Sequence, residues 1–189
     1  MRLIKKITLA VRKFIYWHFD VDRVAEAKIK KSIRIYHRGG FINEFRARFM
    51  WYRLQKTYTT SYPPQITIGK NLRIEHCMGS HIGRTAVFGD NVRIYQHVQV
   101  IAKAVGDQAL RDKRHRRHAK IGNNVVLSCG CTIIGPVTIG DNSIIGANAL
   151  VTHDVPPNSI VVGLNQIRER KASQTLPTFS KNPWEDDRD

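Results

Sequence analysis

The sequence predicts an all-β main domain, a parallel β-helix of triangular cross-section, preceded by a short helical segment. From residue 61 onward, large apolar residues recur every six positions, and glycine often follows them directly. An α-helix does not produce this period, whereas short strands joined by tight corners, three to a coil, do. Because each coil rests on the previous one, such a repeat is stable only as a stack.

Two sets of residues are expected to point into the prism. The large ones are Ile68, Ile74, Ile82, Phe88, Ile94, Val100, Ile121, Leu127, Ile133, Ile139, Ile145 and Val151. The smaller ones, four places later in a repeat, are Ala86, Val92, Val98, Val125, Val137 and Ala149. The twelve repeats make about four coils, with a short insertion between Ile74 and Ile82 and a longer loop between Val100 and Ile121.

The segment before the repeats has a different character. Residues 1–60 carry 15 Lys or Arg against 4 Asp or Glu, so most of the net charge of +16 lies there. Apolar residues spaced by three and four predict an amphipathic helix over about residues 2–18, and a second helix is expected over 41–56. These helices either pack on the main domain or on another subunit, or they lie on an anionic membrane surface.

The strongly basic composition, with a pI near 10.2, implies an anionic partner. The most basic stretch, "RDKRHRRHAKIG" at 111–122, has no recognition helix or aromatic stacking motif beside it, which disfavours nucleic acid. Its residues Arg111, Lys113, Arg114 and Arg116 either form a solvated face or meet anionic groups of a ligand.

The remaining composition indicates the compartment. Cys77, Cys129 and Cys131 lack the spacing of a zinc site or a disulfide framework, so we expect packing roles in a reducing compartment. No apolar run reaches the length of a signal peptide or membrane span. We therefore expect a cytoplasmic protein, with residues 1–20 able to contact the inner face of a membrane.

The repeats, together with "IEHCMG" at 74–79 and "RHAKIG" at 117–122, resemble the left-handed β-helix acyltransferases of the hexapeptide-repeat family. The residues at these motifs are most similar to those of the serine acetyltransferase branch, which includes relatives that acetylate bacterial polysaccharides. The resemblance covers about residues 61–163. It implies three parts: a basic helical segment (1–60), a left-handed β-helix domain (61–167) and a polar tail (168–189).

The resemblance also implies a mechanism, in which an acetyl group passes directly from acetyl-CoA to a hydroxyl. His76 matches the general base, a task that imidazole suits near neutral pH. His118 matches the second catalytic histidine, and Arg117 and Glu75 match acceptor-binding positions. His118 and Arg117 are expected to orient the acceptor and to stabilise the developing oxyanion.

For the cofactor, the resemblance implies that Ile101, Ala102, Lys120, Gly146 and Ala147 contact acetyl-CoA, without a metal ion. It further implies a homotrimer, because cofactor sites in this fold lie between adjacent prisms.

The chain departs from the family pattern at several positions. Ser61 stands where an Asp usually orients the base, Ile101 and Ala102 replace a Gly-Gly pair, and Arg84 replaces a Glu. We take Glu75, or an acid from a neighbouring subunit, as a substitute for the missing Asp. The changed surroundings, the longer loop at 101–118 and the short helical segment favour a sugar acceptor in surface-polysaccharide synthesis. The alternatives are L-serine as the acceptor and a non-catalytic scaffold or interaction protein.

Other residues near these motifs are less favoured as catalytic residues. His115 is the alternative to His118 if the loop is shifted, and His81 and His97 are expected to pack or to face solvent. Direct transfer needs no cysteine nucleophile, so Cys77 is assigned to packing.

Overall fold

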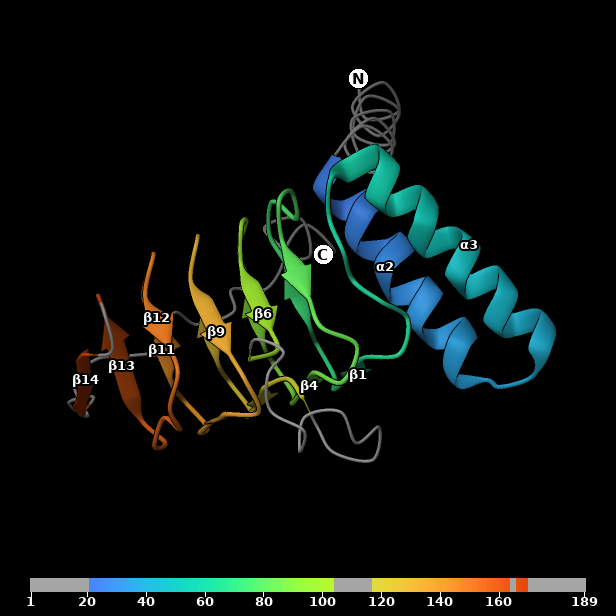
Figure 1. Ribbon diagram of the computed structural model, residues 1–189. Helices are drawn as coiled ribbons and strands as arrows, with labels where there is room; N and C mark the ends of the chain where they lie inside the picture. The colour runs from blue at the N-terminus through green and yellow to red at the C-terminus, as the bar shows by residue number, and fades with distance from the viewer. Residues whose placement is uncertain (1–20, 104–116, 164–165, 170–189) are drawn as a thin grey trace, which may run out of the picture.

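The computed structural model describes residues 21–103, 117–163 and 166–169. It confirms the left-handed β-helix and adds a pair of helices at the prism end where the chain enters (Figure 1). No helix within these ranges is both long enough and apolar enough to cross a lipid bilayer.

The strands repeat in threes to make four coils. The first two coils contain β1 (Thr67–Ile68), β2 (Arg73–Ile74), β3 (His81–Ile82), β4 (Val87–Phe88), β5 (Arg93–Ile94) and β6 (Gln99–Ile101). The next two contain β7 (Lys120–Ile121), β8 (Val126–Leu127), β9 (Thr132–Ile134), β10 (Thr138–Ile139), β11 (Ile144–Ile145) and β12 (Leu150–Val151). They are followed by β13 (Ser159–Val162) and β14 (Gln166–Glu169), which pairs antiparallel to β13.

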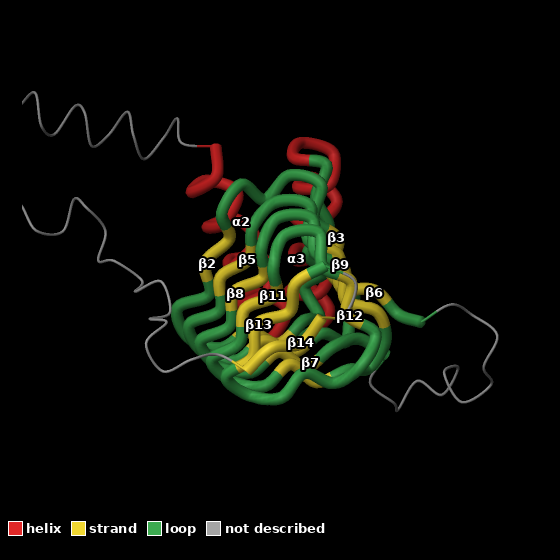
Figure 2. Tube along the Cα trace, turned by 90° about the vertical axis from the view of Figure 1, so that its left-hand side faces the viewer, coloured by secondary structure: helices red, strands yellow, loops and turns green. Residues whose placement is uncertain are grey.

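Each side of the prism is one sheet, named here after its first strand. The orders are β1-β4-β7-β10, then β14-β13-β11-β8-β5-β2, then β12-β9-β6-β3, and all pairings except β13 with β14 are parallel. The view along the prism shows the triangular outline, with the β2 and β3 sheets on opposite sides of one corner (Figure 2).

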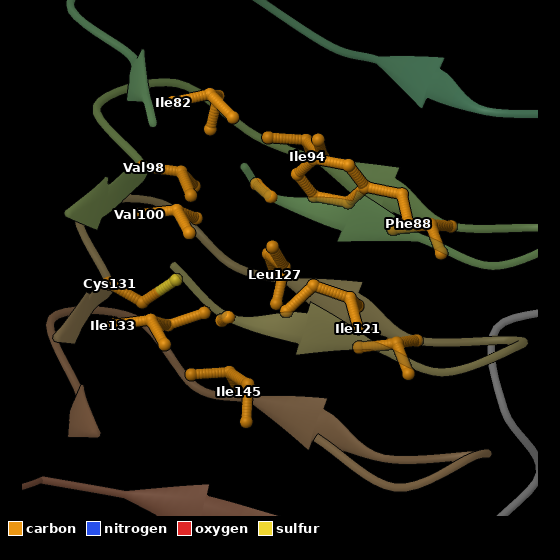
Figure 3. Close-up of a cluster of buried hydrophobic side chains, with 14 of the residues drawn as sticks. Ile82, Phe88, Ile94, Val98, Val100, Ile121, Leu127, Cys131, Ile133 and Ile145 are labelled. Atoms are coloured by element: carbon orange, nitrogen blue, oxygen red, sulfur yellow. The ribbon is translucent and has the colours of Figure 1, made fainter. Parts of the chain in front are cut away.

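The core is made by the residues that the six-residue period predicts. Every predicted inward residue is buried except Ile68, which is partly buried against the core. Side chains such as Phe88, Leu127 and Ile133 pack between successive coils (Figure 3). The core cluster is apolar apart from the Tyr62 hydroxyl and the thiols of Cys77 and Cys131. The buried hydroxyls of Ser80, Ser143 and Ser159 donate to backbone carbonyl oxygens, so the exposed polar side chains lie on the prism surface.

One corner is stabilised by a column of asparagines. Asn71, Asn91, Asn124, Asn142 and Asn158 all have positive φ, a conformation that Asn tolerates better than most residues. Each amide donates to the next Asn side chain along the prism, over 2.9 to 3.2 Å. The column keeps the coils in register.

Two antiparallel helices cover the first coil. Helix α3 (Phe41–Tyr58) matches the helix predicted at 41–56, whereas α2 (Val21–His37) was not predicted. Five residues of α2 are buried, and four of them, Ala25, Ile29, Ser32 and Ile33, have the three- and four-residue spacing that would have revealed the helix; the fifth is Ile35. The helix predicted near residues 2–18, and most of the loop between β6 and β7, lie outside the described residues.

Polar contacts fix α2 against the first coil at both ends. Near its start, Glu26 Oε2 accepts a hydrogen bond from the backbone N–H of Ile74 over 3.2 Å. At its end, His37 Nε2 lies 3.0 Å from the carbonyl oxygen of Ile66. The face of α2 that carries Glu26 is therefore held at the end of β2.

Candidate active site

His76 lies at the corner between the β2 and β3 sheets. It follows β2 by two residues and has a φ of 51°, so the chain turns sharply there. Its side chain is 67% exposed, which leaves the imidazole open to a ligand. Residues in this left-handed conformation carry strain and are frequent at functional sites.

The carboxylate partner of His76 comes from α2. Asp22 Oδ2 lies 2.7 Å from His76 Nδ1. Asp22 is one helical turn before Glu26, so both carboxylates lie on the same face of α2. The bond from Glu26 to Ile74 holds that face beside β2, and this places Asp22 within reach of His76.

This contact assigns the proton on the imidazole. An ionised carboxylate only accepts hydrogen bonds, so Nδ1 carries the hydrogen that it donates to Asp22. In the neutral ring, Nε2 then has a free lone pair. His76 is thereby prepared to accept a proton at Nε2.

The structure corrects the predicted substitute for the missing Asp. Within the chain, Asp22 rather than Glu75 contacts the His76 imidazole. Glu75 instead lies 3.7 Å from a guanidinium nitrogen of Arg73. Ser61 accepts a hydrogen bond from Gln55 Nε2 and makes none with His76.

His118 lies at a different corner, where the chain enters β7. The hydroxyl of Thr85 lies 2.7 Å from His118 Nδ1, and the backbone N–H of Thr85 donates to the same nitrogen over 3.4 Å. The Thr85 oxygen also accepts from the backbone N–H of Arg117. Because Nδ1 is an acceptor, the hydrogen of the neutral ring is on Nε2. His118 therefore presents a donor, the opposite polarity to His76.

Two features of its surroundings hold His118 neutral and in place. Burial, then the positive charges of Arg117 and Arg84, lower the pKa of His118 below its ordinary value of 6.5. The ring lies directly over Gly83, where a Cβ atom would stand 1.8 Å from His118 Cδ2. Only glycine at position 83 leaves room for this ring position.

The predicted site residues fall into two groups along two edges of the prism. By strand register, Ala147 lies in the same column as His76, with Gly146 beside it. Ile101 ends β6, Ala102 follows it, and Lys120 begins β7. Gly83, which lies under the His118 ring, pairs with the end of β6 through the Val100 carbonyl, so these residues lie on the His118 edge. The whole β3 sheet separates the two edges, and the structure does not bring the two histidines together within one chain.

The other histidines and the cysteines have local contacts where they are described. His81 Nδ1 lies 3.2 Å from the carbonyl oxygen of Gly79. The ring of His97 packs over the same glycine. Burial raises the pKa of the Cys77 thiol to about 11, so it is a poor nucleophile near neutral pH. Cys131 is also buried, whereas Cys129 is partly exposed. His115 lies outside the described residues.

Sequence reasoning missed Asp22, Thr85 and Gly83. Asp22 had one available signal, since it is one of only 4 acidic residues in the basic segment 1–60. Thr85 and Gly83 had none beyond their place in the repeat. No group of three His, Cys, Asp or Glu side chains among residues 21–103 and 117–163 is arranged to hold a metal ion.

Comparison with known proteins finds sequence matches in the β-helical part of the chain. Residues 118–153 match the family model described as bacterial transferase hexapeptide (six repeats). Over 113 residues the chain is 42% identical to the probable serine acetyltransferase 1 of Oryza sativa subsp. japonica, covering 59% of this chain and 34% of that protein. Over 101 residues it is 42% identical to a serine acetyltransferase of Staphylococcus aureus, covering 53% of this chain and 44% of that protein.

A solved structure extends the likeness to most of the chain. Soybean serine acetyltransferase complexed with serine superposes with a TM-score of 0.68 and 27% identity, over 81% of this chain and 59% of that one. The chain spans less than half the length of the two curated relatives.

Proposed function

Because the β-helical part of this chain belongs to the left-handed β-helix acyltransferases of the hexapeptide-repeat family, we propose that it is an acetyl-CoA-dependent O-acetyltransferase. The observation that carries the proposal is the His76 imidazole held by Asp22 with Nε2 free. A hydroxyl is a poor nucleophile at neutral pH, and a base positioned in this way removes its proton as it attacks.

We propose L-serine as the acceptor. The named relatives are serine acetyltransferases, and none of them supports the sugar acceptor expected from the sequence. The charges also suit serine, since Asp22 and Glu75 near His76 complement its ammonium group, and Arg117 beside His118 complements its carboxylate.

The proposed reaction is a direct transfer. The serine hydroxyl oxygen bonds to the thioester carbonyl carbon while its proton moves to His76 Nε2. The Nε2–H of His118 donates to the oxyanion that forms, which lowers the barrier. The C–S bond then breaks, and His76 returns the proton to the sulfur of the departing CoA.

The proposed mechanism needs His76 and His118 at the same acceptor molecule, although the β3 sheet separates the two residues within one chain. We therefore propose a homotrimer in which the His76 edge of one prism faces the His118 edge of its neighbour. Acetyl-CoA would lie in the same seam, in contact with Ile101, Ala102 and Lys120 from one chain and with Gly146 and Ala147 from the other.

A substrate panel tests the proposed function. The purified protein is incubated with acetyl-CoA and either L-serine, D-serine or sugar nucleotides, and the products are identified by mass spectrometry. O-acetyl-L-serine is the expected product, and His76→Ala should form it at least about a hundredfold more slowly. Acetylation of a sugar instead would overturn the serine assignment, and failure to bind acetyl-CoA would overturn the enzyme assignment. Failure to bind acetyl-CoA would favour a non-catalytic scaffold, the alternative that the sequence also allows.

A further inference from the structure

Helix α3 exposes an unusual set of large apolar side chains. Phe41, Ile42, Phe45, Phe49 and Tyr52 are each between 52% and 85% exposed. At about 100° per residue they fall within an arc of about 100° on the helix. We call this set the aromatic face.

The aromatic face points away from the rest of the molecule. The buried residues of α3 are Ala47 and Leu54, which lie on the opposite side of the helix from the arc's centre. Those residues face α2, which lies between α3 and the prism (Figure 1). Nothing in the described part of the chain covers the aromatic face.

Positive charge borders the aromatic face along one side. Arg46 and Arg53 follow the edge of the arc, and Lys56 extends it at the C-terminal end, with its Nζ atom 5.6 Å from the centre of the Tyr52 ring. On the other side Arg48 is paired with Glu44 over 2.6 Å, which leaves that side close to neutral. Cationic charge is therefore concentrated on the side that turns toward α2.

A pocket opens on that same cationic side. It has a volume of about 350 Å³ between α2 and α3, and its lining includes Lys28, Lys31 and Arg53 together with the hydroxyl of Thr57. Met50 and Leu54 supply apolar wall. Three cations and a hydroxyl above apolar side chains suit an anionic phosphate whose attached chain continues over apolar surface.

We propose that the aromatic face and the adjoining cationic pocket dock the protein on an anionic lipid surface, independently of the proposed acetyl transfer. Aromatic side chains enter the boundary between headgroups and acyl chains, and flanking cations bind the anionic headgroups. A second copy of the chain is a poor occupant, because α3 carries four cations against one acid and two copies would bring like charges together. The same charge argument disfavours residues 1–20 as a cover, since five of their side chains are Lys or Arg.

The test is sedimentation of the full-length protein with vesicles. The wild type is expected to bind vesicles of phosphatidylcholine mixed with phosphatidylglycerol and to be released by high salt. Vesicles of phosphatidylcholine alone should bind it much more weakly, because the headgroup charge is lost. Equal binding to both vesicle types, or to neither, would overturn the proposal.

Variants assign the binding to this surface. Phe45→Ser with Phe49→Ser should reduce partitioning at least about tenfold without changing the charge. Arg53→Gln should reduce it about fivefold, whereas Lys70→Gln, which removes an exposed charge from the prism, is the control and should leave it nearly unchanged. Circular dichroism and thermal melting verify that each variant is folded.

Two results would contradict the assignment. Full vesicle binding by the Phe45→Ser, Phe49→Ser variant would place the binding elsewhere, for example in residues 1–20. A change in the oligomeric state of that variant in vesicle-free solution, measured by sedimentation velocity, would identify the face as a contact between copies of the chain.

Discussion

Asp22 and His76 are 54 residues apart in the chain, yet a carboxylate oxygen of Asp22 lies 2.7 Å from Nδ1 of His76. The acid comes from a helix and the base from a corner of the β-helix. The position of the imidazole proton, on which the proposed mechanism relies, thus depends on how α2 docks against the first coil, and this dependence can be tested by substitution.

Asp22→Asn should lower kcat by orders of magnitude, up to about 10⁴-fold, the loss that follows when the same change leaves a catalytic histidine in the wrong tautomer. An amide can donate to Nδ1, and it would then favour the tautomer that has its hydrogen on Nε2. Steady-state kinetics should show the loss in kcat more than in KM, and nitrogen NMR should show the changed tautomer.

Ser61→Ala is the matched control, because Ser61 occupies the position of the usual Asp but bonds only to Gln55 among the described side chains. It should leave kcat close to that of the wild type. A larger loss from Ser61→Ala than from Asp22→Asn would contradict the assignment of Asp22.

The close packing of the His118 ring on Gly83 predicts the effect of a larger residue at position 83. Gly83→Ala would place a methyl group within 2.0 Å of His118 Nε2, so the ring must move away from its position. We expect kcat/KM to fall while far-ultraviolet circular dichroism is retained. Thr85→Val should also lower kcat/KM by removing the hydroxyl partner of Nδ1, whereas Thr85→Ser should preserve it. Equal activity of the Val and Ser variants would show that this bond does not matter.

The electrostatic setting of His118 predicts a pH dependence. Its pKa is lowered by burial and by Arg117 and Arg84, so Arg84→Gln should raise it, as measured by NMR titration of the ring. As pH falls below about 6.5, the unfolded chain binds a proton at His118 before the folded protein does. The free energy of unfolding should therefore fall in that range, and fall less in His118→Gln. A pKa of 6.5 or above for His118 in the wild type would contradict this account.

A site shared between chains predicts complementation. His76→Ala and His118→Ala proteins should each be nearly inactive, but mixed trimers contain seams with an intact His76 on one side and an intact His118 on the other. Co-expression should restore a substantial part of the activity. Mixed trimers without activity would contradict the shared site, as would a fully active monomer.

The sequence predicted the prism well because its information is local. A six-residue period decides which side chains point inward, and residues such as Phe88 and Leu127 are buried as that period requires. The burial of Cys131 follows from the same pattern, since it lies four residues after Leu127, whereas Cys129 lies outside the pattern and is partly exposed. Cys77 is buried although it lies in the short insertion, outside the period.

The partner of His76 was not predicted, because it depends on a long-range contact. No residue near Asp22 in the chain indicates which coil α2 contacts. The hydrogen bond between Glu26 and the backbone of Ile74 holds α2 at the first coil. The opposed tautomers of His76 and His118 were likewise inaccessible, since they follow from hydrogen bonds to Asp22 and Thr85.

The most direct test of the central claim, that His76 is the general base, is the initial rate of CoA release from acetyl-CoA in the presence of L-serine. His76→Ala should reduce that rate by about a hundred- to ten-thousandfold, the usual contribution of a positioned base. Acetyl-CoA binding and thermal stability should remain close to those of the wild type. A rate for folded His76→Ala close to the wild-type rate would contradict the claim.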